Sequence, residues 1–205
     1  LDFGFTTIDE RDKAATTALG GLTQGVSVLE QTAAYATIAN GGTYYEPMFY
    51  SVVYDHDGNV LLDNSEQETH RVLKETTAFL LTDMMRDVIT KGTGTKAAIS
   101  GMNVAGKTGT TNSAKVAWYA GFGANLVTTT YVGFDDNKRV LGKGEAGAKT
   151  AMPAWVAYMK AALSDIPERQ LALPPNIMEK TIDSNSGLLS EGGGRKEYFI
   201  VGTEP

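Results

Sequence analysis

The chain contains no cysteine, which excludes disulfide bonds, thiol catalysis and thiolate metal sites. No apolar run approaches the roughly twenty residues that a membrane-spanning helix needs. Lysine and arginine form no cluster that could follow a phosphate backbone, and the net charge is -6, so we expect no nucleic-acid partner. Hydrophobic residues make up 42% of the 205 residues, which indicates a globular protein of one domain or two small subdomains.

The chain also lacks an initiator methionine and a signal peptide, since it opens with Leu1, Asp2, Phe3 and Gly4. We therefore expect an internal piece of a longer protein, with any membrane anchor upstream of Leu1.

The most informative segment covers residues 104–112 and reads Val-Ala-Gly-Lys-Thr-Gly-Thr-Thr-Asn. An apolar lead-in ends in Lys107, Thr108 and Gly109, which place a cation, a hydroxyl group and a glycine at the end of an expected strand. A lysine can stabilise negative charge beside a reacting serine, and a glycine leaves room for a substrate backbone. Lys-Thr-Gly is one of three motifs of the penicillin-interacting serine acyltransferases. Alone, it also fits an ordinary strand end with a solvated lysine.

The hydrophobic pattern predicts the main helices and strands. Apolar residues recur at helical spacing in three segments, which predicts helices over residues 28–39, 74–91 and 151–163. Ser27 and Glu30 have the spacing of a capping box at the start of the first helix. Four further segments predict strands, over residues 44–54, 102–111, 115–121 and 126–134, with a short connection at 123–125. We expect a glycine-rich loop over 138–149 and an irregular tail over 174–205 that ends with a strand-like segment at 198–201.

Residues 55–59 read Asp-His-Asp-Gly-Asn and are open to two interpretations. The acidic spacing is similar to a calcium loop, but Gly58 stands one position early and no glutamate closes the loop. We expect a hairpin turn that returns the strand at 44–54 into residues 60–62, and we assign no metal ligand and no cofactor.

Several segments together resemble the C-terminal part of the transpeptidase domain of class A, bifunctional penicillin-binding proteins. The similar segments are residues 21–27, 34–42, 92–95, 105–112, 117–121, 132–136 and 202–205, and the last one is similar to the end of such domains in Gram-negative bacteria. The resemblance implies an α+β fold of the penicillin-binding protein and serine beta-lactamase type, with an antiparallel sheet flanked by helices plus a mainly helical subdomain, present here as a partial domain. On this basis we expect residues 1–100 to form part of the helical subdomain with an inserted hairpin, residues 101–173 the sheet subdomain, and residues 174–205 the tail of the domain.

Two motifs of the family are missing from the chain. No serine has a lysine three residues later or an asparagine two residues later, so neither Ser-x-x-Lys nor Ser-x-Asn occurs. The family places both motifs upstream of the segment that is similar here. The resemblance therefore implies that the nucleophile lies outside this chain, which by itself cannot complete an acyl-enzyme cycle.

The resemblance implies acyl transfer on the D-Ala-D-Ala end of a peptidoglycan stem peptide, through a serine acyl-enzyme that beta-lactams also form. In such a site Lys107 and Thr110 are catalytic, since the lysine supplies positive potential and the Thr110 N–H is an oxyanion donor. The Thr108 and Thr110 hydroxyl groups bind the terminal carboxylate of the substrate, and Gly109 keeps the strand clear for its backbone. Thr111 completes the substrate-binding set, although a structural role at the strand end fits it equally well.

The partners implied are a stem peptide on a lipid-linked or nascent glycan strand, beta-lactam antibiotics and the upstream remainder of the same protein, which in this class also carries a glycosyltransferase. The implied location is the periplasmic side of the inner membrane, with an upstream anchor. Two alternatives remain open. One is a D,D-carboxypeptidase or serine beta-lactamase, in which water resolves the acyl-enzyme, and the other is a non-catalytic cell-wall binding or assembly module.

Overall fold

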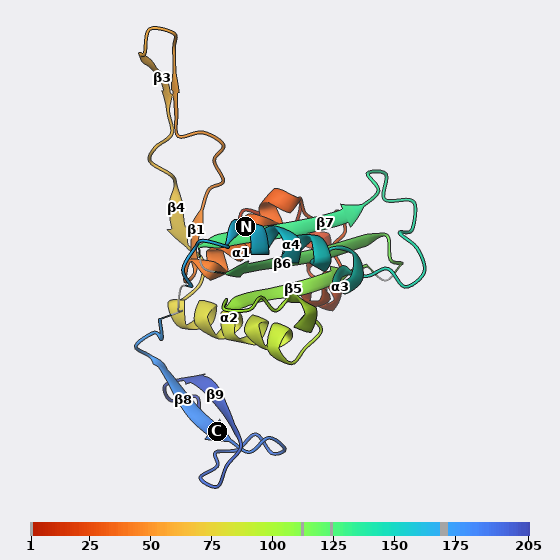
Figure 1. Cartoon of the computed structure of the whole chain (residues 1–205), viewed down its shortest axis with the longest axis vertical. Coiled ribbons are helices and arrows are strands. Elements are labelled where there is room, and N and C mark those ends of the chain that lie inside the picture. Colours follow the sequence, from red (N-terminus) through yellow and green to blue (C-terminus); the bar gives the residue numbers. More distant parts are fainter. Residues whose placement is uncertain (1, 112, 124, 169–171) are drawn as a thin grey trace.

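The computed structural model describes residues 2–111, 113–123, 125–168 and 172–205. Its body is a three-stranded antiparallel sheet in the order β5-β6-β7, with helices packed against it (Figure 1). The strands are β5 (Val104–Thr110), β6 (Val116–Gly123) and β7 (Leu126–Gly133). The predicted antiparallel sheet is therefore confirmed. Asn112 and the Ala124 of the expected 123–125 connection lie outside the described residues.

Helix α4 (Met152–Ala162) covers one face of the sheet, and the short helix α3 (Gly147–Thr150) precedes it. Trp155 of α4 and Tyr119 of β6 are both fully buried, with ring centroids 4.8 Å apart. Such an aromatic pair contributes about 0.5–1.5 kcal/mol beyond its buried area. The indole N–H of Trp155 also donates to the carbonyl of Thr128 at 3.0 Å. Gly121 permits this packing, because a Cβ there would lie 3.0 Å from the Trp155 ring and 2.6 Å from the Ala105 carbonyl oxygen.

Helix α1 (Val28–Ala39) packs against the opposite side of the sheet, and helix α2 (Glu75–Thr90) runs beside β5. Successive residues of a strand point to opposite faces, so Phe122 joins Tyr35 of α1 in a second small core. Helix α2 contributes to both cores, with Met85 in the second and Ile89 in the first. Both helices thus contact the sheet directly. The expected division of the chain into a helical part (1–100), a sheet part (101–173) and a tail (174–205) stays a prediction.

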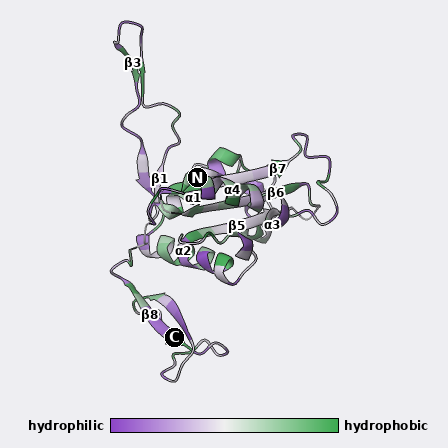
Figure 2. Ribbon diagram, in the orientation of Figure 1, coloured by the Kyte–Doolittle hydropathy of each residue, from purple (hydrophilic) through white to green (hydrophobic). Residues whose placement is uncertain are grey.

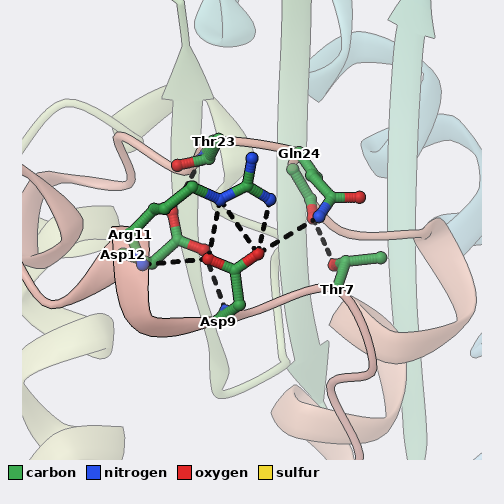
Figure 3. A network of polar contacts seen from close by, with 7 residues as sticks. Thr7, Asp9, Arg11, Asp12, Thr23 and Gln24 are labelled. Atoms are coloured by element: carbon green, nitrogen blue, oxygen red, sulfur yellow. Dashed lines mark hydrogen bonds and ion pairs between the residues drawn. The ribbon is translucent and has the colours of Figure 1, made fainter.

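The segment before α1 is held by a polar network (Figure 3). It contains two 3-10 helices, Glu10–Asp12 and Ala15–Leu19. The carboxylate of Asp9 accepts from the Arg11 Nε at 2.9 Å, and this bond to the Arg11 side chain lowers the pKa of Asp9 well below its usual range. The carboxylate of Asp12 accepts from the Thr23 N–H at 2.7 Å, which ties the first 3-10 helix to the loop that leads into α1.

The predicted capping box at the start of α1 is confirmed. The Glu30 N–H donates to the Ser27 hydroxyl at 3.2 Å, and the Ser27 N–H donates to the Glu30 carboxylate at 2.8 Å. The same carboxylate accepts from the Thr6 N–H at 2.8 Å and from its hydroxyl at 2.7 Å. These hydrogen bonds from Ser27 and Thr6 lower the pKa of Glu30 to about 2.

The prediction of one continuous strand over residues 44–54 is wrong. Strand β1 (Thr43–Tyr45) pairs with β4 (Thr69–Arg71), whereas β2 (Val52–Tyr54) pairs with β3 (Val60–Asp63). Pro47 lies in the interval and cannot donate a ladder hydrogen bond, so the two pairs form separately.

The expected hairpin turn at 55–59 is confirmed, since the Asp55 carboxylate accepts from the N–H groups of Asp57 at 2.9 Å and Asn59 at 2.8 Å.

Two further segments are more regular than the sequence indicated. The end of the expected loop at 138–149 forms α3, and the tail contains a hairpin of β8 (Ile177–Ile182) and β9 (Arg195–Ile200). A glycine-rich interval at 183–194 separates β8 from its partner β9. The sequence around β8 therefore does not indicate which strand it pairs with, and β8 was not predicted. Phe79 of α2 meets Tyr198 edge-on at 5.1 Å, which links this hairpin to the body.

We expect Glu30→Gln to lower the free energy of unfolding at pH 7 by about 1 kcal/mol, because the capping box loses its charged acceptor. The folded-state pKa of Glu30 is depressed, so its stabilising contribution is present above its usual pKa of 4.5 and is lost as the pH falls towards 2. The difference between wild type and variant should therefore shrink across that range in urea unfolding followed by circular dichroism. Glu191→Gln, an exposed position outside the capping box, is the control. A difference that stays constant from pH 7 to pH 2 would contradict the assignment.

Candidate functional site

The segment from Lys107 to Thr110 lies on an open edge of the sheet. Within the described residues, β5 pairs with β6 and no strand pairs with its other side; α2 runs beside β5 there, and the loop after α2 lies at Thr108. The Thr111 N–H donates to the Val116 carbonyl at 3.2 Å and so points towards β6. Because backbone groups alternate along an antiparallel strand, those of Thr108 and Thr110 point away from β6, towards the open edge.

The Lys107 side chain is exposed and curls over this edge. Its ammonium group donates to the Thr108 carbonyl at 3.0 Å and to the Thr108 hydroxyl at 3.3 Å. The Thr108 hydroxyl lies 3.5 Å from that of Thr93, in the loop that follows α2. A cation and two hydroxyl groups are thereby collected at one position on the edge.

Thr110 is held by helix α3. The Gly147 N–H donates to the Thr110 hydroxyl oxygen at 2.9 Å. A hydroxyl group has one hydrogen of its own to donate, so Thr110 can still donate to a ligand while it accepts from Gly147.

Gly147 has to be a glycine for α3 to reach the sheet. A Cβ at this position would lie 2.5 Å from the Trp118 carbonyl oxygen and 2.6 Å from that of Gly109. Sequence reasoning missed this residue, because a helix of four residues has no periodic pattern and Gly147 stands in a segment with several other glycines.

Glu145 holds α3 in place. Its carboxylate accepts from the Lys149 ammonium at 2.5 Å and from the Thr150 hydroxyl at 2.5 Å. These bonds, that to Lys149 first, lower the pKa of Glu145, so its carboxylate is charged at neutral pH.

The remaining residues of the motif shape the strand end. The Thr111 hydroxyl oxygen accepts from the N–H groups of Lys115 at 3.1 Å and Val116 at 3.2 Å, and so closes the turn into β6. Gly109 lies opposite Trp118, and a Cβ on Gly109 would be 3.1 Å from the Trp118 Cβ. Trp118 is half-buried and meets Tyr131 edge-on at 4.8 Å, so an aromatic pair supports the strand beneath Gly109.

Together these groups form an edge suited to an extended anionic ligand. The ammonium of Lys107 and the hydroxyls of Thr108 and Thr110 can bind a carboxylate, while the outward N–H of Thr110 can donate to an oxyanion. Among the described residues no group of three or more histidine, aspartate or glutamate side chains is arranged to hold a metal ion. The helices of this described part are all too short or too polar to cross a bilayer.

Comparison with known proteins gives a consistent answer. A family model described as the penicillin binding protein transpeptidase domain matches residues 4–155. Penicillin-binding protein 1A of Haemophilus influenzae is 65% identical over 144 residues, which cover 66% of this chain and 17% of that protein. Penicillin-binding protein 1A of Vibrio cholerae is 34% identical over 253 residues, which cover 99% of this chain and 30% of that protein. The chain thus spans less than a third of the length of these two relatives.

Solved structures agree with the sequence relatives. The crystal structure of penicillin-binding protein 1A from Haemophilus influenzae matches with a TM-score of 0.90 and 47% identity, over 100% of this chain and 36% of that chain. The PonA1 protein of Mycobacterium tuberculosis in complex with penicillin V matches with a TM-score of 0.71 and 27% identity, over 82% of this chain and 47% of that chain. The chain therefore belongs to the penicillin-binding protein transpeptidase family and forms part of the transpeptidase domain of a class A member.

Proposed function

We propose that this chain is the β5-bearing part of a peptidoglycan D,D-transpeptidase that cross-links stem peptides through a serine acyl-enzyme. The observation that carries the proposal is the open edge of β5, where Lys107, Thr108 and Thr110 gather a cation, two hydroxyl groups and an outward N–H. This arrangement matches what a peptide ending in a carboxylate requires.

The stem peptide would lie along the open edge of β5 as an additional strand. Its terminal carboxylate would accept from the Thr108 and Thr110 hydroxyls, with the Lys107 ammonium adding positive potential. Gly109 leaves the approach free of a side chain. Thr111 follows directly after the substrate-binding strand, and its hydroxyl accepts from the N–H groups of Lys115 and Val116 in the turn into β6.

The reaction then follows in two transfers. A serine outside this chain attacks the carbonyl carbon of the penultimate D-Ala, and its proton passes to a neighbouring base. The developing oxyanion accepts from the Thr110 N–H, and loss of one such donor typically costs on the order of 3 kcal/mol. The base gives this proton to the amine of the terminal D-Ala as the bond to it breaks. An amine of a neighbouring stem then attacks the acyl-enzyme and loses a proton to the base, which returns it to the serine oxygen as the cross-link forms and the serine is released.

Beta-lactams would acylate the same serine, because their carboxylate and carbonyl can occupy the same positions. In support, the related PonA1 protein has been solved with penicillin V. We also propose that the intact protein lies on the periplasmic side of the inner membrane, with an anchoring segment and a glycosyltransferase outside this chain, and the similarity to Gram-negative relatives supports this.

Replacing Lys107 by alanine in the intact protein should slow acylation by a fluorescent penicillin by about a thousandfold, because the site loses the cation that stabilises the substrate carboxylate and the developing negative charge. Lys180→Ala, an exposed lysine on β8, should leave the acylation rate unchanged.

The same labelling experiment identifies the nucleophile. Peptide mapping should place the label on a serine outside residues 1–205, and an assay of D-Ala release against cross-link formation should show transfer to an amine. A label within residues 1–205 would overturn the mechanism, whereas release without cross-links would indicate a carboxypeptidase.

Thr110→Val should reduce acylation by about a hundredfold, since the isosteric side chain cannot donate to the substrate carboxylate. Thr110→Ser keeps the hydroxyl and should stay within a few-fold of wild type. Equal losses in both variants, measured as acylation rate against penicillin concentration, would show that the hydroxyl has no part in recognition.

Gly147→Ala should reduce acylation about tenfold, because the added methyl group displaces α3 from Gly109 and Trp118 and so loosens Thr110. Gly192→Ala is the matched control, since a Cβ there meets nothing within 4 Å. Circular dichroism should show that both variants fold. Normal acylation by the folded Gly147→Ala protein would mean that α3 does not position the site.

A further inference from the structure

Residues 46–68 leave the body of the molecule as a long projection, here called the arm (Figure 1). The β2–β3 hairpin forms its distal part, and the β1–β4 pair joins it to the body. The arm departs from the end of the sheet away from α3, and therefore away from Thr110. It is thus separate from the edge that we assign to the substrate.

The arm exposes large apolar side chains. Five of them are more than half exposed, namely Phe49 (86%), Leu61 (61%), Tyr54 (59%), Val60 (55%) and Leu62 (53%). Figure 2 shows hydrophobic residues on β3, far from either core. An isolated two-stranded hairpin is marginally stable at best, and large exposed apolar patches mark sites of interaction with other molecules.

Apolar side chains lie on both faces of the hairpin. Val53 pairs with Leu62 and, after a register shift that leaves Leu61 as an extra residue on β3, Tyr54 pairs with Val60. Neighbouring residues of β2 point to opposite faces, so the two pairs cover both of them. Within the described part of the chain β2 and β3 pair with each other alone, which leaves their outer edges able to accept an additional strand.

The charge of the arm is of one sign. It carries six carboxylates, on Glu46, Asp55, Asp57, Asp63, Glu66 and Glu68, and no lysine or arginine occurs anywhere in residues 14–70. Glu46, Glu66 and Glu68 line a cavity of about 370 Å³ at the base of the arm, together with Pro47 and Met48. An apolar surface with an acidic surround is complementary to a partner that is both apolar and basic.

We propose that the arm is a docking site for an extended, basic and apolar polypeptide segment of another protein. The segment adds as a strand to the edge of the β2–β3 hairpin and places the apolar side chains of one of its faces against Leu61. Its lysine or arginine side chains meet the carboxylates of Glu66 and Glu68 at the cavity. A second copy of the arm is disfavoured because it brings six further carboxylates, and an anionic membrane surface is disfavoured for the same reason.

The test uses the intact protein and a fluorescent octapeptide of alternating lysine and valine, with binding followed by fluorescence anisotropy. An octapeptide of alternating glutamate and valine controls for apolar association, and one of alternating lysine and glycine controls for charge alone. We expect saturable binding of the lysine–valine peptide that weakens as salt increases, and at least tenfold weaker binding of the other two.

Variants locate the binding surface. Leu61→Asp and the double variant Glu66→Gln/Glu68→Gln should each weaken binding of the lysine–valine peptide about tenfold. The matched controls are Leu188→Asp, at a leucine that is 60% exposed in the tail, and Asp165→Asn/Glu191→Gln, which removes the same charge elsewhere. Both controls should bind as wild type does, and all four proteins should be acylated by fluorescent penicillin at the wild-type rate.

Four results would overturn the proposal. The first is binding of the glutamate–valine peptide as tight as that of the lysine–valine peptide, and the second is binding of the lysine–valine peptide by the arm variants as tight as by wild type. The third is self-association in sedimentation that Leu61→Asp abolishes. The fourth is binding to anionic phosphatidylserine vesicles that exceeds binding to the lysine–valine peptide. Failure of acylation would instead count against the proposed enzyme function, so the two outcomes are distinguishable.

Discussion

The rest of the structure depends on how closely α4 packs against the central strand β6. Trp155 reaches Tyr119 because Gly121 leaves the space that a side chain would occupy. Strand β6 is the partner of both β5 and β7, so the contact that anchors β6 also sets the position of both neighbours. Both rings are buried, and the indole N–H donates to the Thr128 carbonyl. This close packing makes the sheet a rigid support for the residues at the edge of β5.

The rigid sheet allows the edge of β5 to hold the residues of the candidate site in fixed positions. Strand β5 is held on one side by β6 and on the Thr110 side by α3, while its outer backbone groups remain directed away from the sheet. The loop after α2 brings Thr93 beside Thr108, and Lys107 turns back to its own strand. The candidate site is therefore positioned by packing on two sides, and the chemical groups proposed to act there come from four consecutive residues.

Local patterns predicted a large part of the fold. The capping box of Ser27 and Glu30, the helices near 28–39, 74–91 and 151–163, and the three strands of the sheet follow from spacing within one element. The errors fall where the pairing partner is distant. Residues 44–54 divide between two sheets because β1 meets β4, and β8 pairs with β9 across the interval at 183–194.

The sequence by itself determined the identity of the chemical groups in the candidate site. A run of Lys107, Thr108, Gly109 and Thr110 supplies a cation, hydroxyls and a glycine wherever the strand lies. Only the tertiary structure decided which edge of β5 pairs with no strand, that the Gly147 N–H donates to the Thr110 hydroxyl, and that the apolar residues of the arm are exposed in this part of the protein. The physical reason is that hydrogen-bond partners, edges and exposure are properties of contacts between segments far apart in the chain, whereas spacing within one segment records only its own periodicity.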